Sequence, residues 1–225
     1  MDTVTKCLQN LEKEDDGLRA VFLSATIAGA DLNFMRDIDS PASARTFIQH
    51  IDLLCRTIQD FSVPVVAVTD GPCLGAGMEV AAACDLRVAT RQGTVFGMPE
   101  TRVGLPSVVQ ATLIPGLVGW GRARELLYFG DVIDADVALQ WGFVNAVVDR
   151  EALDDKIKEW EDKFSKTAPG ALVAQKALMR TWEERGTGRP GIDASIEAFG
   201  RAFETGEPRR SIEAHFMERS KRKKQ

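Results

Sequence analysis

Apolar positions along this chain of 225 residues follow strand-like and helix-like patterns in turn. A continuous apolar run at residues 63–68 is typical of a strand buried on both faces. Shorter segments predict further strands at residues 20–23, 86–89 and 143–148. Between them, helices are expected at residues 4–13, 46–61 and 76–84. Because strand and helix alternate over short intervals, we predict an α/β core.

Beyond residue 106 the pattern becomes mainly helical. Helices are expected at residues 107–117, 122–128, 135–141, 151–166, 170–184, 192–204 and 210–221, with a loop at 186–191. After residue 149 the pattern predicts helices alone. We therefore divide the chain into an α/β core at residues 1–150 and a helical C-terminal region at residues 151–225.

Composition places the chain among globular proteins, with 44% hydrophobic and 27% charged residues. A net charge of -5 and a pI near 5.2 argue against a general nucleic-acid binder. The basic end at residues 221–224 is interpreted as a solvated tail. There is no apolar run of membrane-spanning length, no signal-peptide pattern and no SKL-type end. We therefore expect a soluble intracellular protein, and the sequence does not identify its compartment.

Cysteine and histidine offer little chemistry in this sequence. The four cysteines form no CxxC pair, and the two histidines lie among charged residues, so we expect no metal site. Cys73 lies in a glycine-rich segment, but no histidine is near it in the sequence to activate a thiolate. A buried, unreactive thiol is therefore the favoured interpretation.

The most informative segment is DGPCLGAGMEVAAACD at residues 70–85, directly after the apolar run. Glycines open a helix of small residues that carries Glu79 in its first turn. A helix start offers N–H groups without internal partners, and its dipole favours negative charge. The segment can thus stabilise a developing oxyanion beside a carboxylate that moves a proton.

A second carboxylate, Glu100, follows Pro99 and by itself suits a loop or helix cap. Together with Glu79 it forms a candidate acid–base pair. The segment AGADL at residues 28–32 predicts a strand-to-helix turn in which Asp31 can act as a cap. Separation along the sequence leaves open whether these residues meet.

In order, these pieces resemble the enoyl-CoA hydratase/isomerase (crotonase) family. The resemblance rests on AGADL (28–32), DGPCLGAGMEVAAACDLRVA (70–89), FGMPETRVGLP (96–106) and GWGRARELLYFGDVIDADVALQWGFVNAVV (119–148). It implies a spiral of ββα repeats with a helical C-terminal region that builds homotrimers, often paired as homohexamers. It also implies an acyl thioester of coenzyme A as substrate, with no separate cofactor, no metal and a place in fatty acid metabolism.

The resemblance further implies residue roles. The backbone N–H groups of Ala30 and Ala76 fall on the oxyanion hole, and Glu79 and Glu100 on the two catalytic glutamates. Glu79 would activate water for attack at the β carbon, and Glu100 would protonate the α carbon. The remaining residues expected to bind substrate or coenzyme A are Ala28, Asp31, Leu32 and Gly75.

Two departures from the family pattern concern the N-terminal part. The usual opening strand and loop are absent before residue 4, and the loop at residues 24–27 is shorter than usual.

Both glutamates favour a 2-enoyl-CoA hydratase. The alternatives are an enoyl-CoA isomerase, another acyl-CoA enzyme of this fold, or a non-catalytic scaffold.

Overall fold

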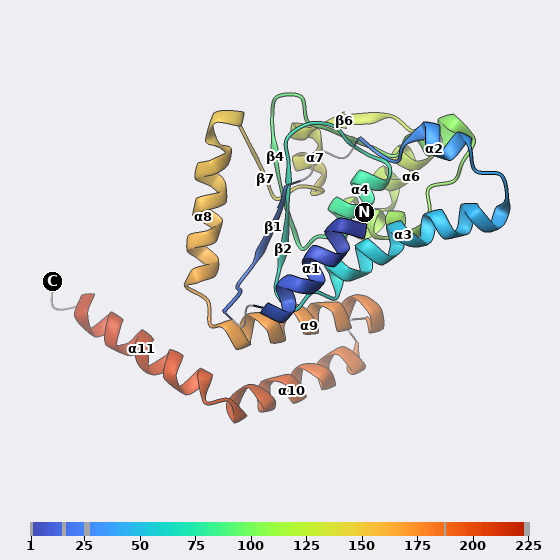
Figure 1. Ribbon diagram of the computed structural model, residues 1–225. Helices are drawn as coiled ribbons and strands as arrows, with labels where there is room; N and C mark the ends of the chain where they lie inside the picture. Colours follow the sequence, from blue (N-terminus) through green and yellow to red (C-terminus); the bar gives the residue numbers. More distant parts are fainter. Residues whose placement is uncertain (1, 15–16, 25–27, 187, 223–225) are drawn as a thin grey trace.

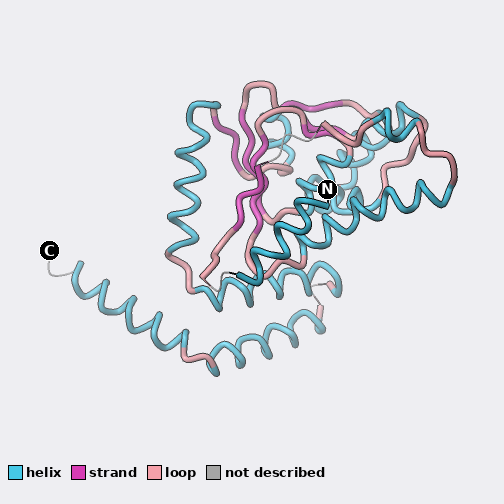
Figure 2. Tube along the Cα trace, in the orientation of Figure 1, coloured by secondary structure: helices cyan, strands magenta, loops and turns pink. Residues whose placement is uncertain are grey.

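The computed structural model describes all residues except 1, 15–16, 25–27, 187 and 223–225. Its central feature is a parallel sheet with the strand order β1–β2–β4–β7 (Figures 1 and 2). The strands are β1 (Val21–Ser24), β2 (Val65–Thr69), β4 (Leu86–Thr90) and β7 (Ala146–Val148). In register, Val68 lies opposite Ser24 on one side and Val88 on the other. Every residue of β2 is buried, as its continuous apolar run predicts.

A second, shorter sheet lies beside the end of β2 and β4. Its strands are β3 (Cys73–Leu74), β5 (Val95–Gly97) and β6 (Val132–Asp134), in the order β3–β5–β6. Strands of two or three residues show no periodic pattern, so the sequence did not predict them. β2 leads into β3 and then into α4 (Ala76–Ala83), and β4 leads into β5. This succession agrees with the expected ββα repeats.

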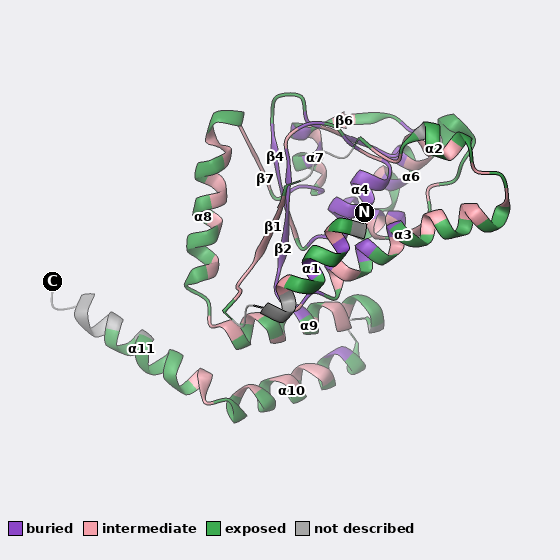
Figure 3. Ribbon diagram, in the orientation of Figure 1, coloured by how far each residue is buried: buried purple, intermediate pink, exposed green. Residues whose placement is uncertain are grey.

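Helices cover both faces of the larger sheet (Figure 1). On one face, α8 (Leu153–Ser165) packs Leu153, Ile157, Trp160 and Phe164 against the sheet. These side chains recur every three or four residues, which places them on one side of the helix. On the other face lie α1 (Asp2–Glu14), α3 (Pro41–Gln59) and α4. Figure 3 shows burial concentrated in the sheet, in α4 and on the inward side of α3.

Short elements complete the core between β1 and α8. They are α2 (Leu32–Arg36), η1 (Pro99–Val103), η2 (Val109–Leu113), α5 (Ile114–Val118), α6 (Trp120–Phe129), α7 (Ala135–Trp141) and η3 (Arg150–Ala152). The predicted helix at 107–117 is therefore wrong in its first part. Val108 is extended and Val109 has a φ of 37°, so regular helix begins only at Ile114.

Beyond α8, the C-terminal region continues with α9 (Pro169–Arg185), α10 (Arg189–Glu204) and α11 (Glu207–Arg222). Lys176 on α9 anchors it to the core. Its buried ammonium donates to the carbonyls of Ile58 (3.1 Å) and Val63 (2.9 Å) and to Asp85 Oδ2 (2.8 Å). In Figure 1, α11 extends away from the body of the molecule, and both α10 and α11 are mostly exposed in Figure 3.

Several predicted boundaries differ from the structure for identifiable reasons. α3 begins at Pro41 rather than at 46, because Ser40 and Ser43 form a reciprocal cap before Pro41. α10 begins at Arg189, within the expected loop, with Pro190 in its first turn. Two sequence predictions fall partly outside the described residues. They concern the shortened loop at residues 24–27, of which 25–27 are not described, and the basic end, of which 223–224 are not described.

Candidate active site

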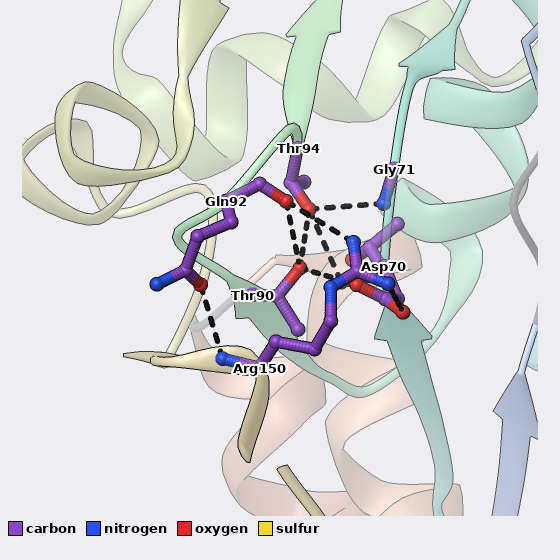
Figure 4. A network of polar contacts seen from close by, with 7 residues as sticks. Asp70, Gly71, Thr90, Gln92, Thr94 and Arg150 are labelled. Atoms are coloured by element: carbon purple, nitrogen blue, oxygen red, sulfur yellow. Dashed lines mark hydrogen bonds and ion pairs between the residues drawn. The ribbon is translucent and has the colours of Figure 1, made fainter. Parts of the chain in front are cut away.

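The turn from β2 into α4 carries the glycine-rich motif, and a polar network holds its first residues (Figure 4). Thr90 Oγ1 donates to Asp70 Oδ1 at 2.7 Å, and Arg150 Nη1 contacts Asp70 Oδ2 at 2.5 Å. Next along the chain, the N–H of Gly71 donates to Thr94 Oγ1 at 3.0 Å. The network therefore ties the end of β2 to β4, to the residue before β5 and to the start of η3.

Gly75 is the residue at which the chain turns into α4. Its φ of 51° favours glycine, and its N–H donates to the carbonyl of Gly97 at 2.9 Å. A Cβ added here would lie 2.6 Å from Glu100 Oε1. The residue is thus glycine for two reasons, the backbone angle and the approach of a carboxylate. Ala76, the next residue, opens α4, so its N–H has no partner within the helix.

Glu79 is buried, with 3% of its surface exposed. Its Oε1 accepts a hydrogen bond from the N–H of Ala111 at 3.2 Å. Burial raises the pKa of Glu79 to about 7; the Ala111 N–H opposes this rise, and the charge of Glu100 adds to it. The carboxyl group therefore changes its charge near neutral pH, which suits proton transfer.

Glu100 lies in the first turn of η1 and accepts a hydrogen bond from Ser107 Oγ at 2.8 Å through Oε2. Glu79 and Glu100 line one cavity of about 670 Å³. Ala28, Ala30, Gly75 and Ala76 line the same cavity. The structure thus brings together six of the eight residues that the sequence singled out.

The segment at residues 28–30 reaches the cavity by passing close to β3. Gly29 has a φ of 103°, and a Cβ placed on it would lie 3.2 Å from the carbonyl oxygen of Leu74. This close passage sets Ala30 beside the start of α4, at the same cavity as Ala76. An oxyanion hole made by their two N–H groups stays a prediction that this placement allows.

The two other residues that the sequence singled out, Asp31 and Leu32, lie at the start of α2. The exposed Asp31 caps α2, because its Oδ1 accepts from the N–H of Asn33 at 2.8 Å. Leu32 is the first residue of α2. Asp31 is not among the described residues that line the cavity, and the side chain of Leu32 lies outside what the structure describes. Their predicted contact with the substrate stays a prediction, whereas the capping role that the sequence allowed for Asp31 is confirmed.

Much of the cavity wall is apolar and was not assigned to a site from the sequence. Side chains from α2, the turn that follows it, α3, the end of η1 and the segment after η1 form it, namely Met35, Ile38, Phe47, Ile48, Ile51, Val103, Leu105 and Val108. The helical spacing of Phe47 and Ile51 indicated a buried face but could not distinguish core from pocket. Ser107 and Ala111, which contact the two carboxylates, carried no signal in the sequence.

Cysteine and metal chemistry gain no support from the geometry. Cys73 is buried on β3, and burial raises the pKa of its thiol to about 12. It is therefore a neutral thiol at physiological pH, as the sequence interpretation held. Within the described residues, no three metal-ligating side chains gather at one point. None of the helices described there is long and apolar enough to cross a bilayer.

Comparison with known proteins agrees with this geometry. The family model described as enoyl-CoA hydratase/isomerase matches residues 1–225. A crotonyl-CoA hydratase of Syntrophomonas wolfei is 34% identical over 196 residues, which are 87% of this chain and 74% of the relative. A short-chain-enoyl-CoA hydratase of Clostridium acetobutylicum is 32% identical over 231 residues, 98% of this chain and 84% of the relative.

Solved structures give the same answer for the fold. The crystal structure of an enoyl-CoA hydratase from Bacillus anthracis superimposes with a TM-score of 0.88 at 26% identity, covering 97% of this chain and 87% of that chain. A structure from Mycobacterium smegmatis, also titled enoyl-CoA hydratase, has a TM-score of 0.84 at 29% identity, covering 89% and 79%. The chain belongs to the enoyl-CoA hydratase/isomerase family and has the crotonase fold.

Proposed function

We propose that this protein is an enoyl-CoA hydratase, adding water across the double bond of a 2-enoyl-CoA thioester. The observation that carries the proposal is the placement of two carboxylates, Glu79 and Glu100, on one cavity beside the start of α4. Family membership and the names of the hydratase relatives support it. Coenzyme A enters as part of the substrate, and we expect no separate cofactor.

In this mechanism the thioester oxygen lies between the N–H groups of Ala30 and Ala76. Attack at the β carbon moves electrons toward that oxygen, and the two donors stabilise the enolate that forms. Donors that are already oriented before the reaction stabilise such a charge without having to reorganise. Loss of one such donor typically costs about a hundredfold or more in rate.

The two carboxylates would hold the attacking water between them. Glu79, when ionised, accepts a proton from the water as its oxygen bonds to the β carbon. Glu100, when protonated, gives its proton to the α carbon, and the enolate pair forms the new C–H bond while the carbonyl is restored. Glu79 then holds a proton and Glu100 has lost one. One proton passing between them, directly or through solvent, completes the cycle.

The apolar part of the cavity would take the acyl chain. Ile38, Phe47 and Ile51 lie on elements that precede the glycine-rich motif, and Leu105 and Val108 follow Glu100. This arrangement favours an unsubstituted acyl group over one with a charged end.

An isomerase is the second candidate, because one well-placed carboxylate suffices to move a proton between two carbons. A relative from Mycosarcoma maydis, 29% identical, is named enoyl-CoA isomerase/hydratase. The presence of both carboxylates at the cavity favours hydration. A non-catalytic scaffold is the third candidate, and it predicts that neither carboxylate matters.

The test follows the absorbance of trans-2-enoyl-CoA esters of several chain lengths with wild type, Glu79→Gln and Glu100→Gln. A hydratase loses the enoyl absorbance with wild type and far more slowly with either variant. Conversion of a 3-enoyl-CoA without hydration identifies an isomerase. Binding of the esters without any turnover in wild type supports the scaffold.

We further propose that the protein assembles as a homotrimer, or as a hexamer of two trimers, through its C-terminal region. Large apolar side chains on α10 and α11 are exposed, including Phe199 at 71%. The others are Ile192, Ile196, Phe203, Ile212, Phe216 and Met217. So many exposed apolar groups on two adjacent helices are unusual for a monomer. Light scattering after size exclusion measures the mass directly, and a monomer at micromolar concentration would contradict the proposal.

A further inference from the structure

One continuous segment, residues 104–111, provides a hydrogen-bond donor to each carboxylate of the site. Ser107 Oγ donates to Glu100 Oε2 at 2.8 Å, and the N–H of Ala111 donates to Glu79 Oε1 at 3.2 Å. The segment starts where Gly104, with a φ of 80°, ends η1. The N–H of Leu105 then returns to the carbonyl of Glu100 at 3.0 Å, which turns the chain back over that residue.

Between the two donors the backbone adopts a costly conformation. Val109 has a φ of 37°, and a β-branched residue rarely takes a positive φ. The preceding residue, Val108, is fully extended. Conformations of this kind persist where the surrounding structure requires them, and they gather at functional sites. Here the sharp turn at Val109 allows Ser107 and Ala111 to face different carboxylates of the same cavity.

The contacts of Glu100 differ between its two oxygens. Oε2 accepts from Ser107, whereas Oε1 lies against Gly75, where a Cβ would come within 2.6 Å. Ser107 is the hydrogen-bond partner that the described residues provide to this carboxylate. An oxygen that accepts from Ser107 is less available to carry a proton, so Oε1 is the oxygen left for it. Gly75, which Oε1 approaches, directly precedes Ala76, whose N–H is proposed to bind the thioester oxygen.

We propose that Ser107 is a positioning residue, which orients Glu100 so that Oε1 delivers its proton to one face of the α carbon. The α carbon is bonded to the thioester carbonyl carbon, so an oxyanion bound at Ala76 places it near Gly75 and Oε1. The proton leaves Oε1 as the enolate pair forms the C–H bond, and the carboxylate that remains is still bound by Ser107. The proposal rests on the proposed acyl-CoA chemistry but not on hydration in particular.

Removal of the hydroxyl should act on proton delivery rather than on binding. In Ser107→Ala, the Glu100 carboxyl is free to rotate, so we expect kcat to fall by about tenfold or more while KM stays within about twofold. The fall is smaller than the loss of a general acid, which costs about a hundredfold or more. Ser107→Thr keeps the hydroxyl and should recover most of the lost kcat.

Thr101→Ala is the matched control. Thr101 follows Glu100 directly in η1, but its hydroxyl points to the carbonyl of Tyr128 at 3.4 Å. Its removal takes away a hydroxyl next to Glu100 without touching the carboxylate. Its kcat should therefore equal that of wild type.

The decisive readout is the stereochemistry of proton delivery, which a merely structural role would not change. Hydration in D2O places deuterium on the α carbon, and NMR of the product gives the face. Wild type, Thr101→Ala and Ser107→Thr should label one face, whereas Ser107→Ala should label both. Wild-type kcat and one labelled face in Ser107→Ala would overturn the proposal.

A second measurement separates this proposal from the hydratase assignment. Exchange of the α protons of a saturated acyl-CoA in D2O needs Glu100 and the oxyanion hole, but no double bond. If wild type exchanges without hydrating and Ser107→Ala exchanges more slowly, the hydratase assignment fails and the role of Ser107 stands. If wild type neither exchanges nor hydrates, both proposals are overturned.

Discussion

Replacement of Glu79 by glutamine should stabilise the protein above pH 7 while it removes activity. Glu79 is 3% exposed, and its pKa of about 7 lies above its ordinary value of 4.5. The folded state therefore holds this proton more tightly than the unfolded chain does. Between pH 4.5 and about 7 the unfolded chain has released the proton and the folded protein has not, so stability falls as pH rises.

The size of this change in stability follows from the difference between the folded and unfolded pKa values of Glu79. From 4.5 to about 7, at roughly 1.4 kcal/mol per pH unit, the carboxylate costs about 3 kcal/mol of folding free energy at alkaline pH. Glutamine has nearly the same shape, stays neutral and still offers an oxygen to the N–H of Ala111. The variant should therefore match wild type near pH 4 and exceed it by about 3 kcal/mol above pH 8.

Urea unfolding at fixed protein concentration, repeated from pH 4 to pH 9, measures this difference. The exposed Glu151 provides the control, because Glu151→Gln should stay within about 0.5 kcal/mol of wild type throughout. A stability difference between Glu79→Gln and wild type that does not change with pH would refute the reasoning. So would a variant that becomes less stable than wild type as pH rises.

Further outcomes are expected. In Glu100→Gln the pKa of Glu79 should move down, since the neighbouring negative charge that raises it is gone, and carbon NMR of the labelled carboxyl group measures this; an unchanged pKa would contradict the coupling. Gly75→Ala should lose about 1–3 kcal/mol of stability and displace Glu100, because it combines a positive φ with a 2.6 Å contact; wild-type stability and turnover would contradict both reasons. Lys176→Met should lower the free energy of unfolding by about 2–3 kcal/mol, because two carbonyls and Asp85 lose the donor that they share. The loss is smaller than for a fully buried ion pair because the side chain of Asp85 is 34% exposed. An unchanged urea unfolding curve would contradict the anchoring role of Lys176.

The sequence predicted the parts of the fold that carry long periodic patterns. β2 is a continuous apolar run, whereas α3 and α8 repeat apolar residues every three or four positions, and the burial of each element follows its pattern. The second sheet could not be predicted from the sequence, because β3 has only two residues and is defined by its pairing with β5. Strands of this length are defined by their neighbours and not by their own composition.

The same distinction holds within the site. Glu79 could be identified as a candidate site residue because the glycines and small residues around it indicate a helix start that a ligand can approach closely. Its burial could not be derived, since an acid in an apolar helix is equally compatible with the surface. The contacts of Ser107 and Ala111 with the two carboxylates could be identified only from distances in the structure. A serine after a proline and an alanine in a helical segment have no distinctive sequence pattern.

The most direct test of the central claim is hydration of trans-2-enoyl-CoA by wild type and by the Glu79→Gln and Glu100→Gln variants, alongside binding of a saturated acyl-CoA. The account predicts rapid hydration by wild type, a loss of about a hundredfold or more in kcat in each variant, and nearly unchanged binding in both. Equal turnover in wild type and either variant would contradict the role of that carboxylate. Folded wild type that binds the ester and leaves it unhydrated would contradict the claim as a whole.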